Sequence, residues 1–233
     1  MKSKSADKIK MPSIDELLGV SGEESATDIE ISRIHSFANH PFKVLDDDKM
    51  DDLVESIKQN GVLTPVLVRP DKNNSYEMIS GHRRMHAAIK AGLETIPAIV
   101  RDMNDDDAVV VMVDANIQRE ELLPSEKAFA YKMKMDAMKR QAGRPSKENG
   151  ATVLPHLQGK KSREILAAES GESHEQIRKY IRLTNLVPEL LEFVDEGRIK
   201  MRPAVELSYL DEDCQRDVVD EIDLNDATPS HDQ

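Results

Sequence analysis

Two short segments, 80–87 and 116–122, carry the side chains of this chain that are best suited to bind an anion. In the first, Arg83 and Arg84 follow Gly81 at the start of an apolar-periodic run, which predicts a helix that begins there. Free backbone N–H groups at a helix N-terminus and planar guanidinium groups can converge on one phosphate. The sequence therefore predicts an anion site, for a nucleotide or for the backbone of DNA.

A second pattern, further along the chain, is typical of a helix-turn-helix DNA reader. Segment 162–168 predicts a short positioning helix, 171–173 a turn and 174–183 a recognition helix, with Ile177 and Ile181 able to face inward. In such readers the first residues of the second helix meet base edges, and later basic residues contact phosphates. Gln pairs with adenine and Arg with guanine. The predicted DNA-binding residues are Ser173, His174, Gln176, Arg178, Lys179 and Arg182.

The elements expected around the two arginines alternate between strands and helices. This alternation predicts a small α+β domain. Hydrophobic periodicity, with Gly and Asn as stops, fixes the elements. They are a helix at 48–59, strands at 62–69 and 76–79 joined by a turn at 71–75, a helix from Gly81 to Gly92, and a strand at 95–101.

Helical periodicity resumes at about Asp106 and dominates the rest of the chain. Pro124 opens a long helix through Arg140, and the Gly-, Pro- and Lys-containing segment 141–161 reads as a loop or insertion. Two further helices, near 188–195 and 203–210, would buttress the reader.

Composition limits the kind of DNA binding that is possible. With 32 Lys and Arg against 44 Asp and Glu, the net charge is -12, which argues against a protein that coats nucleic acid indiscriminately. Between Lys139 and Arg182, however, basic residues outnumber acidic ones by about two to one. DNA binding is therefore expected to be local to the predicted reader. An aromatic content of 3% argues against base stacking of single strands.

Cys214 is the one cysteine, which excludes an intramolecular disulfide and a zinc site built on cysteines. No apolar run approaches the length of a membrane span, and the N-terminus leads into no apolar signal segment. A cytoplasmic protein is expected.

The order of these motifs resembles the ParB/RepB family of bacterial partition proteins. The resemblance is carried by Gly-x-Arg-Arg-x-x-Ala from Gly81, by Asn-Ile-Gln-Arg-Glu-x-Leu-x-Pro-x-Glu-x-Ala from Asn116, and by the downstream reader. It covers roughly residues 30 to 210. It implies a ParB/sulfiredoxin-like nucleotide-binding domain at 31–120, an all-α helix-turn-helix domain at 121–225 and a tail at 226–233. The polar composition of residues 1–30 predicts a flexible arm that folds on a partner, or alternatively an inert disordered tail.

The resemblance also implies a ligand, CTP with Mg²⁺. Asn116 would offer a carbonyl oxygen to the metal, and the arginines would hold the phosphates. The residues implied in nucleotide binding are Thr64, Pro65, Gly81, His82, Arg83, Arg84, His86, Ala87, Asn116 and Arg119.

Three positions depart from the family pattern, which usually has glutamate after the glycine, glutamate before the asparagine, and a third arginine. Here these positions are His82, Ala115 and His86. Losing the acid beside Asn116 removes a plausible metal or water-orienting ligand. Asp114 could substitute, although a helix would point it about 100° from Ala115. CTP binding with slow or absent hydrolysis is expected.

Other interpretations of these motifs stay open. The arginines could lie at a solvated helix end or contact DNA phosphates directly, and the reader could be an ordinary charged hairpin. His82 and His86 have metal-ligand spacing, but no cysteine or third histidine accompanies them, which disfavours zinc.

The function implied is a sequence-specific DNA-binding partition protein for a plasmid, mobile element or chromosome, dimeric, nucleoid-associated and switched by CTP. The alternative is a transcriptional regulator of the same fold that has lost the switch, which His82 and Ala115 favour. An enzyme of this fold, a nuclease or a sulfiredoxin-like reductase, is disfavoured because the arginine motif lacks the cysteine and has few carboxylates around it. Early lysines resemble the tails with which family members stimulate a partner ATPase; they are Lys2, Lys4, Lys8 and Lys10.

Overall fold

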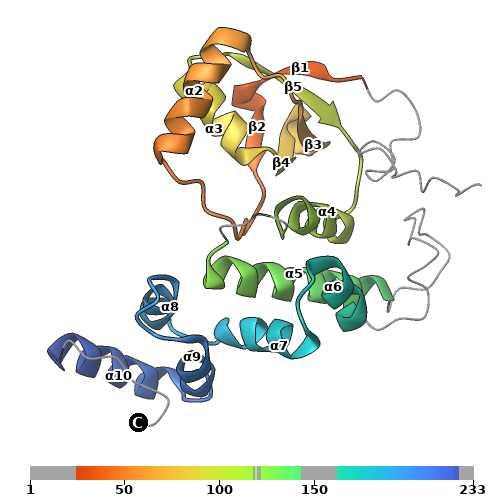
Figure 1. The fold of residues 1–233 in the computed structure, drawn as a ribbon. Coiled ribbons are helices and arrows are strands. Elements are labelled where there is room, and N and C mark those ends of the chain that lie inside the picture. Colours follow the sequence, from red (N-terminus) through yellow and green to blue (C-terminus); the bar gives the residue numbers. More distant parts are fainter. Residues whose placement is uncertain (1–24, 118, 120–121, 143–161, 226–233) are drawn as a thin grey trace, which may run out of the picture.

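The computed structural model describes residues 25–117, 119, 122–142 and 162–225. Figure 1 shows two regions: a sheet with two helices beside it, and an array of helices below it. Helix α4 (Asp105–Ile117) lies between them, against strand β4 on one side and helix α5 (Pro124–Ala142) on the other. This arrangement confirms the predicted α+β domain followed by a helical domain.

The sheet has five strands in the order β1-β5-β3-β4-β2. The β1/β5 and β3/β4 pairs are antiparallel, whereas β5/β3 and β4/β2 are parallel. Val66 and Val68 of β3 are fully buried while the residues between and after them are not, the alternation of a strand with one covered face. The bounds are β1 Thr27–Glu30, β2 Ile34–Ser36, β3 Val66–Pro70, β4 Tyr76–Ser80 and β5 Thr95–Val100, with short 3-10 turns η1 at Ile31–Arg33 and η2 at Lys72–Asn74.

Helices α2 (Asp48–Asn60) and α3 (His82–Lys90) lie beside each other next to the sheet (Figure 1). Asp47 caps α2, because its side chain accepts a hydrogen bond from the backbone N of Met50 at 2.9 Å. Met50 is fully buried and packs in one cluster with Ala87 of α3. This packing fixes the start of α3, where the predicted anion site lies.

Helix α4 buries side chains against both regions, which explains why its sequence is apolar around most of its circumference. Val113 is fully buried in a cluster that contains Phe42 and Ile79 from the sheet region and Ala130 from α5. The two predicted domains therefore share one core at α4, rather than meeting at a flexible linker.

A buried lysine also connects the two regions through ion pairs. The side chain of Lys134 in α5 is 2% exposed, and its ammonium donates to Asp114 of α4 and, at 2.5 Å, to Glu169 Oε2 of α6. A buried charge is tolerated only when it is paired, and here two carboxylates from two other helices pair with it. The cation holds α4, α5 and α6 together.

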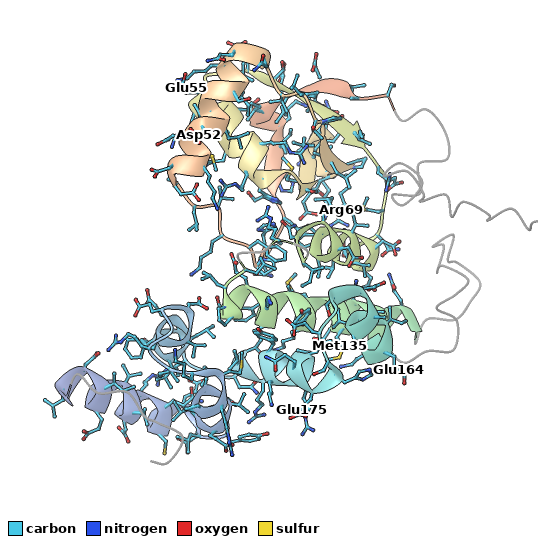
Figure 2. The ribbon with its side chains drawn as sticks, viewed as in Figure 1. Asp52, Glu55, Arg69, Met135, Glu164 and Glu175 are labelled. Atoms are coloured by element: carbon cyan, nitrogen blue, oxygen red, sulfur yellow. The ribbon has the colours of Figure 1, made fainter. Side chains whose placement is uncertain are left out.

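The helical region contains the predicted helix-turn-helix. Ile177 is fully buried against Tyr131 of α5 and Leu166 of α6. Figure 2 shows labelled Met135 among these helices, whereas Glu175 lies on the outer side of α7. The later helices pack around Leu183 and Leu190. The helices are α6 Ser162–Ser170, α7 His174–Leu183, α8 Pro188–Asp195, α9 Met201–Leu207 and α10 Glu212–Asn225.

Several predicted boundaries were wrong. Thr27–Glu30 pairs with β5, so the first strand lies inside the range expected for the flexible arm. The strand expected to begin at Val62 begins at Val66, because 62–65 forms a loop. The lysines of the arm, most of 141–161 and the tail lie outside the described residues. None of the described helices combines the length and the apolarity that crossing a membrane would need.

Candidate nucleotide site and DNA reader

Gly81 sets the geometry at the start of α3. Its φ of +109° is a left-handed conformation that suits glycine, and it forms the N-cap of the helix. A Cβ atom at this position would lie 2.6 Å from Val66 Cγ1 of β3. Only glycine lets the chain turn from β4 into α3 this close to the neighbouring strand, and the turn leaves the first N–H groups of α3 facing the predicted site.

Replacing Gly81 by alanine should therefore cost about 2 kcal/mol in the free energy of unfolding, from backbone strain and the clash with Val66. Urea denaturation measures this cost. Gly92→Ala is the matched control, because Gly92 also has positive φ (+80°) but nothing within 4 Å of a Cβ atom. Equal losses in the two variants would contradict the role of the close approach to β3.

Arg84 has a structural role in the loop 62–65. Its Nη1 donates to the carbonyl oxygens of Thr64 at 2.7 Å and Pro65 at 2.6 Å. Burial lowers the pKa of this guanidinium. The three predicted site residues therefore lie together, with Arg84 holding the loop at the edge of the site.

Arg83 and Arg119 bring positive charge to the same place from two motifs. Arg83 Nη2 lies 3.2 Å from Asp47 Oδ1. Burial lowers the pKa of the Arg119 guanidinium, and the charge of Arg83 lowers it further. Arg119 has no ion-pair or side-chain hydrogen-bond partner among the residues that the structure describes, whereas Arg83 has one. The cluster of two guanidinium groups is thus only partly neutralised.

His82, the first residue of α3, is buried and stacks on His40 with ring centroids 3.8 Å apart. Burial, then the charges of His40 and Arg119, lower the pKa of His82 to about 3. The Nε2 atoms of both rings are buried and lack a partner in the described part of the chain. Burial, followed by the charge of Arg119, also lowers the pKa of His40, while the hydrogen bond to Phe42 and the charge of Glu126 oppose this shift.

Two other predicted residues of α3 lie elsewhere. His86 Nε2 is 2.9 Å from Asp46 Oδ1, which also accepts from Lys90. Ala87 is fully buried in the core between α2 and α3, so its side chain faces away from any ligand. The prediction that Ala87 lines the site was wrong, since the small side chain serves helix packing.

Asn116 is 4% exposed near the end of α4, and its Nδ2 donates to the carbonyl oxygen of Met112 at 2.8 Å. This bond orients the side chain and assigns Oδ1 as the acceptor that a cation would use. Ala115 is exposed, and Asp114 pairs with Lys134. The prediction that Asp114 could stand in for the family glutamate was wrong, because its carboxylate is held by α5. Among the described residues, no group of three or more His, Cys, Asp or Glu side chains is placed to hold a metal.

The sequence analysis missed His40 and Glu126. Glu126 accepts backbone hydrogen bonds from Lys43 N at 2.6 Å and Leu123 N at 3.0 Å, which fastens the loop of His40 to α5. A lone histidine before a proline carries no periodic signal, so no local pattern could have identified His40. The second motif did contain Glu126, whose role emerges only in three dimensions.

In the reader, Ser173 is the N-cap of α7, and its Oγ accepts from Gln176 N at 3.1 Å. His174 and Arg178 are exposed, and Lys179 Nζ lies 3.0 Å from Glu175 Oε1. The N-terminal part of α7 thus exposes His174 and Arg178, whereas Gln176 is half-buried.

The side chain of Arg182 is bonded to other residues of the protein. Its Nη2 donates to Ser208 O at 2.6 Å, its Nε donates to Ser208 Oγ at 3.0 Å, and its guanidinium lies 3.9 Å from the ring centroid of Tyr209. The predicted phosphate contact is corrected to a bond between α7 and the end of α9.

Comparison with known proteins agrees with this description. The ParB N-terminal domain model matches residues 18–117, and the ParB HTH domain model matches residues 156–228. Together they match well over half of the chain.

Curated relatives carry related names. Stage 0 sporulation protein J of Bacillus subtilis is 32% identical over 179 residues, 77% of this chain and 56% of that protein. The nucleoid occlusion protein of Listeria innocua is 30% identical over 205 residues, 88% of this chain and 65% of that protein. The chain spans less than two thirds of the length of these relatives.

Among solved structures, a C-terminally truncated ParB from Caulobacter crescentus complexed to the centromeric parS site has a TM-score of 0.50 and 22% identity, over 87% of this chain and 94% of that one. A Pnob8-like ParB-N domain has the same TM-score and 16% identity, over 87% of this chain and 83% of that one. At these identities the likeness concerns the fold alone. With both domain models matched in order, and relatives that are 30% and 32% identical to it over the aligned residues, this chain belongs to the ParB family.

Proposed function

We propose that this chain is a sequence-specific DNA-binding partition protein whose N-terminal domain binds CTP with Mg²⁺. The observation that carries the proposal is the incompletely neutralised pair Arg83 and Arg119 beside the N-terminus of α3. The names of relatives, which include chromosome-partitioning and nucleoid occlusion proteins, support the DNA half.

Each site residue has a role that its chemistry supports. Arg83 and Arg119 would bind phosphate oxygens, with the free N–H groups of the first turn of α3. The loop that Arg84 holds through Thr64 and Pro65 would lie along the base and ribose, as the family resemblance implies. These donors fit a triphosphate, because they supply positive charge and directed N–H groups.

Asn116 fits the role of a single protein ligand to Mg²⁺, since that ion is usually held by one or two protein oxygens plus substrate phosphates. The cation would supply charge neutralisation between the phosphates. Ala115 stands at the position of the family glutamate, and Asp114, the other neighbour considered for that role, is held by Lys134. We therefore propose slow or absent hydrolysis.

The DNA half of the proposal places α7 in the major groove. The exposed N-terminal part of α7 carries His174, Gln176 and Arg178, whose side chains can hydrogen-bond base edges. The fold of a ParB solved on parS DNA supports this orientation by analogy. Dimerisation, action at the bacterial nucleoid and a partner ATPase that meets the arm remain parts of the proposal that follow from the family.

Two substitutions in α7 should separate base reading from phosphate binding. Gln176→Ala should weaken binding to the specific site by about 1–3 kcal/mol while leaving random duplex unaffected. Lys179→Ala should weaken both duplexes alike and lower the salt dependence of binding by about one ion. Fluorescence anisotropy over a salt series, on a site selected from random DNA, measures both effects. Equal losses on both duplexes in the two variants would contradict the assignment.

The experiment that tests the nucleotide half is calorimetric titration of CTP in Mg²⁺ buffer, with ATP, GTP and UTP as controls. Selective CTP binding supports the partition-type switch. An absence of binding, with and without the selected DNA site, would overturn the nucleotide half and leave a DNA-binding regulator on the same fold.

A further inference from the structure

The stacked histidines His40 and His82 stand where no family motif predicts a pair. They come from a loop and from the first turn of α3, and their ring centroids are 3.8 Å apart. Both Nε2 atoms are buried without a partner among the described residues. Buried polar atoms are normally hydrogen-bonded, so two neighbouring exceptions in one site call for an explanation in terms of a missing ligand.

The tautomer of His40 is fixed by its neighbour. Its Nδ1 lies 2.8 Å from the carbonyl oxygen of Phe42, which only accepts, so Nδ1 carries the hydrogen. In the neutral ring, Nε2 then carries a lone pair and no hydrogen. Such a ring repels a phosphate oxygen, whereas the protonated ring donates a hydrogen bond to it. His40 can therefore bind an anion only as a cation.

Burial and the charges around the pair explain why it is neutral without a ligand. Burial is the largest cause that disfavours the proton on each ring; the charge of Arg119, after α4, adds to it for both rings, and the charge of His40 adds to it for His82. Arg83 of α3 acts in turn on Arg119. Glu126 of α5 favours the proton on His40, but both its oxygens already accept backbone hydrogen bonds.

We propose that His40 and His82 form part of the phosphate site, and that the protein takes up a proton when the nucleotide binds. The two rings share this proton. This inference rests on the proposed nucleotide site. The phosphates would neutralise Arg119, whose charge adds to burial in disfavouring the proton in the free protein, and would accept a hydrogen bond from the ring that gains the proton. Repulsion between rings this close limits the uptake to about one proton.

Proton uptake on binding fixes the direction in which the nucleotide affinity changes with pH. The bound form holds more protons than the free form, so affinity must rise as pH falls, by up to about tenfold per pH unit. A site built on arginines alone would show no such dependence, because arginine stays charged throughout this range. The histidine that replaces the family glutamate at position 82 would thus make nucleotide binding sensitive to pH.

The test is calorimetric titration of CTP with excess Mg²⁺ at neutral pH, in buffers of different ionisation enthalpy. The dependence of the observed enthalpy on the buffer gives the number of protons taken up. We expect about one proton per nucleotide in the unmodified protein. His40→Gln and His82→Gln should reduce this number and flatten the dependence of affinity on pH between about pH 8 and about pH 6.

His35→Gln is the matched control. His35 is exposed and pairs with Asp71 at 2.9 Å on strand β2, so proton uptake should be unchanged in that variant. The buffer series on the unmodified protein decides the matter even if the His82 variant fails to fold. Nucleotide binding without proton uptake would overturn this inference alone, whereas an absence of binding at every pH would overturn the proposed nucleotide site and this inference with it.

Discussion

Replacing Lys134 by methionine should lower the free energy of unfolding by about 3 kcal/mol. The Lys134 side chain is 2% exposed and its ammonium pairs with Asp114 and Glu169, so the substitution removes from both carboxylates the cation that they share. Burial already raises the pKa of Asp114, and the charge of Lys134 opposes that rise. The loss lies at the lower end of the range for broken buried pairs because the acids are 43% and 36% exposed.

Thermal and urea denaturation would measure the effect, and Lys132→Met is the matched control. Lys132 belongs to the same helix and is exposed, so its substitution should change stability by less than about 0.5 kcal/mol. The same small change in both variants would contradict a structural role for the buried cation. A stable Lys134→Met variant would also mean that α4 and α6 are held together by apolar packing alone.

Lys134 illustrates what a sequence can and cannot reveal. The long helix from Pro124 was predicted from its periodicity, and the helix His174–Leu183 was predicted with its bounds correct. Yet Lys134 reads as one polar residue among several on α5. Its burial depends on Asp114 and Glu169, whose contacts with α5 follow from the tertiary fold and not from any local pattern.

The strands show the same limit. The β3/β4 hairpin was predicted, because a β-branched run and a second short strand flank a turn. Strands β1 and β2 were missed, because they are short and their pairing partners β5 and β4 lie far along the chain. A local sequence pattern identifies helices and longer strands, whereas strands as short as β1 and β2 depend on pairing with a strand that is distant in the sequence.

At the candidate site, the motifs predicted which residues would gather but not how they would be used. Arg84 was expected to bind phosphate and instead holds the backbone of Thr64 and Pro65. The family pattern could not have distinguished it from Arg83, since the two are adjacent and chemically identical. The direction of each side chain from the first turn of α3 makes the difference.

Replacing Arg119 by alanine should weaken CTP binding by about 10- to 100-fold, the value of one or two charge-assisted hydrogen bonds. Arg83→Ala should have a smaller effect. The guanidinium of Arg83 already bonds Asp47 at 3.2 Å, so binding a phosphate exchanges one partner for another, whereas Arg119 has no partner to lose in the described part of the chain. Calorimetric titration of CTP in Mg²⁺ buffer measures both affinities.

Arg33→Ala is the control for this pair. Arg33 donates to the carbonyl oxygen of Asn74 and lies over the ring of Tyr76, at the opposite end of β4 from Gly81, so its loss should leave CTP affinity unchanged. A larger effect for Arg83 than for Arg119 would contradict the ranking and would mean that Asp47 releases Arg83 at little cost. Unchanged affinity in both variants would place the phosphates away from Arg83 and Arg119.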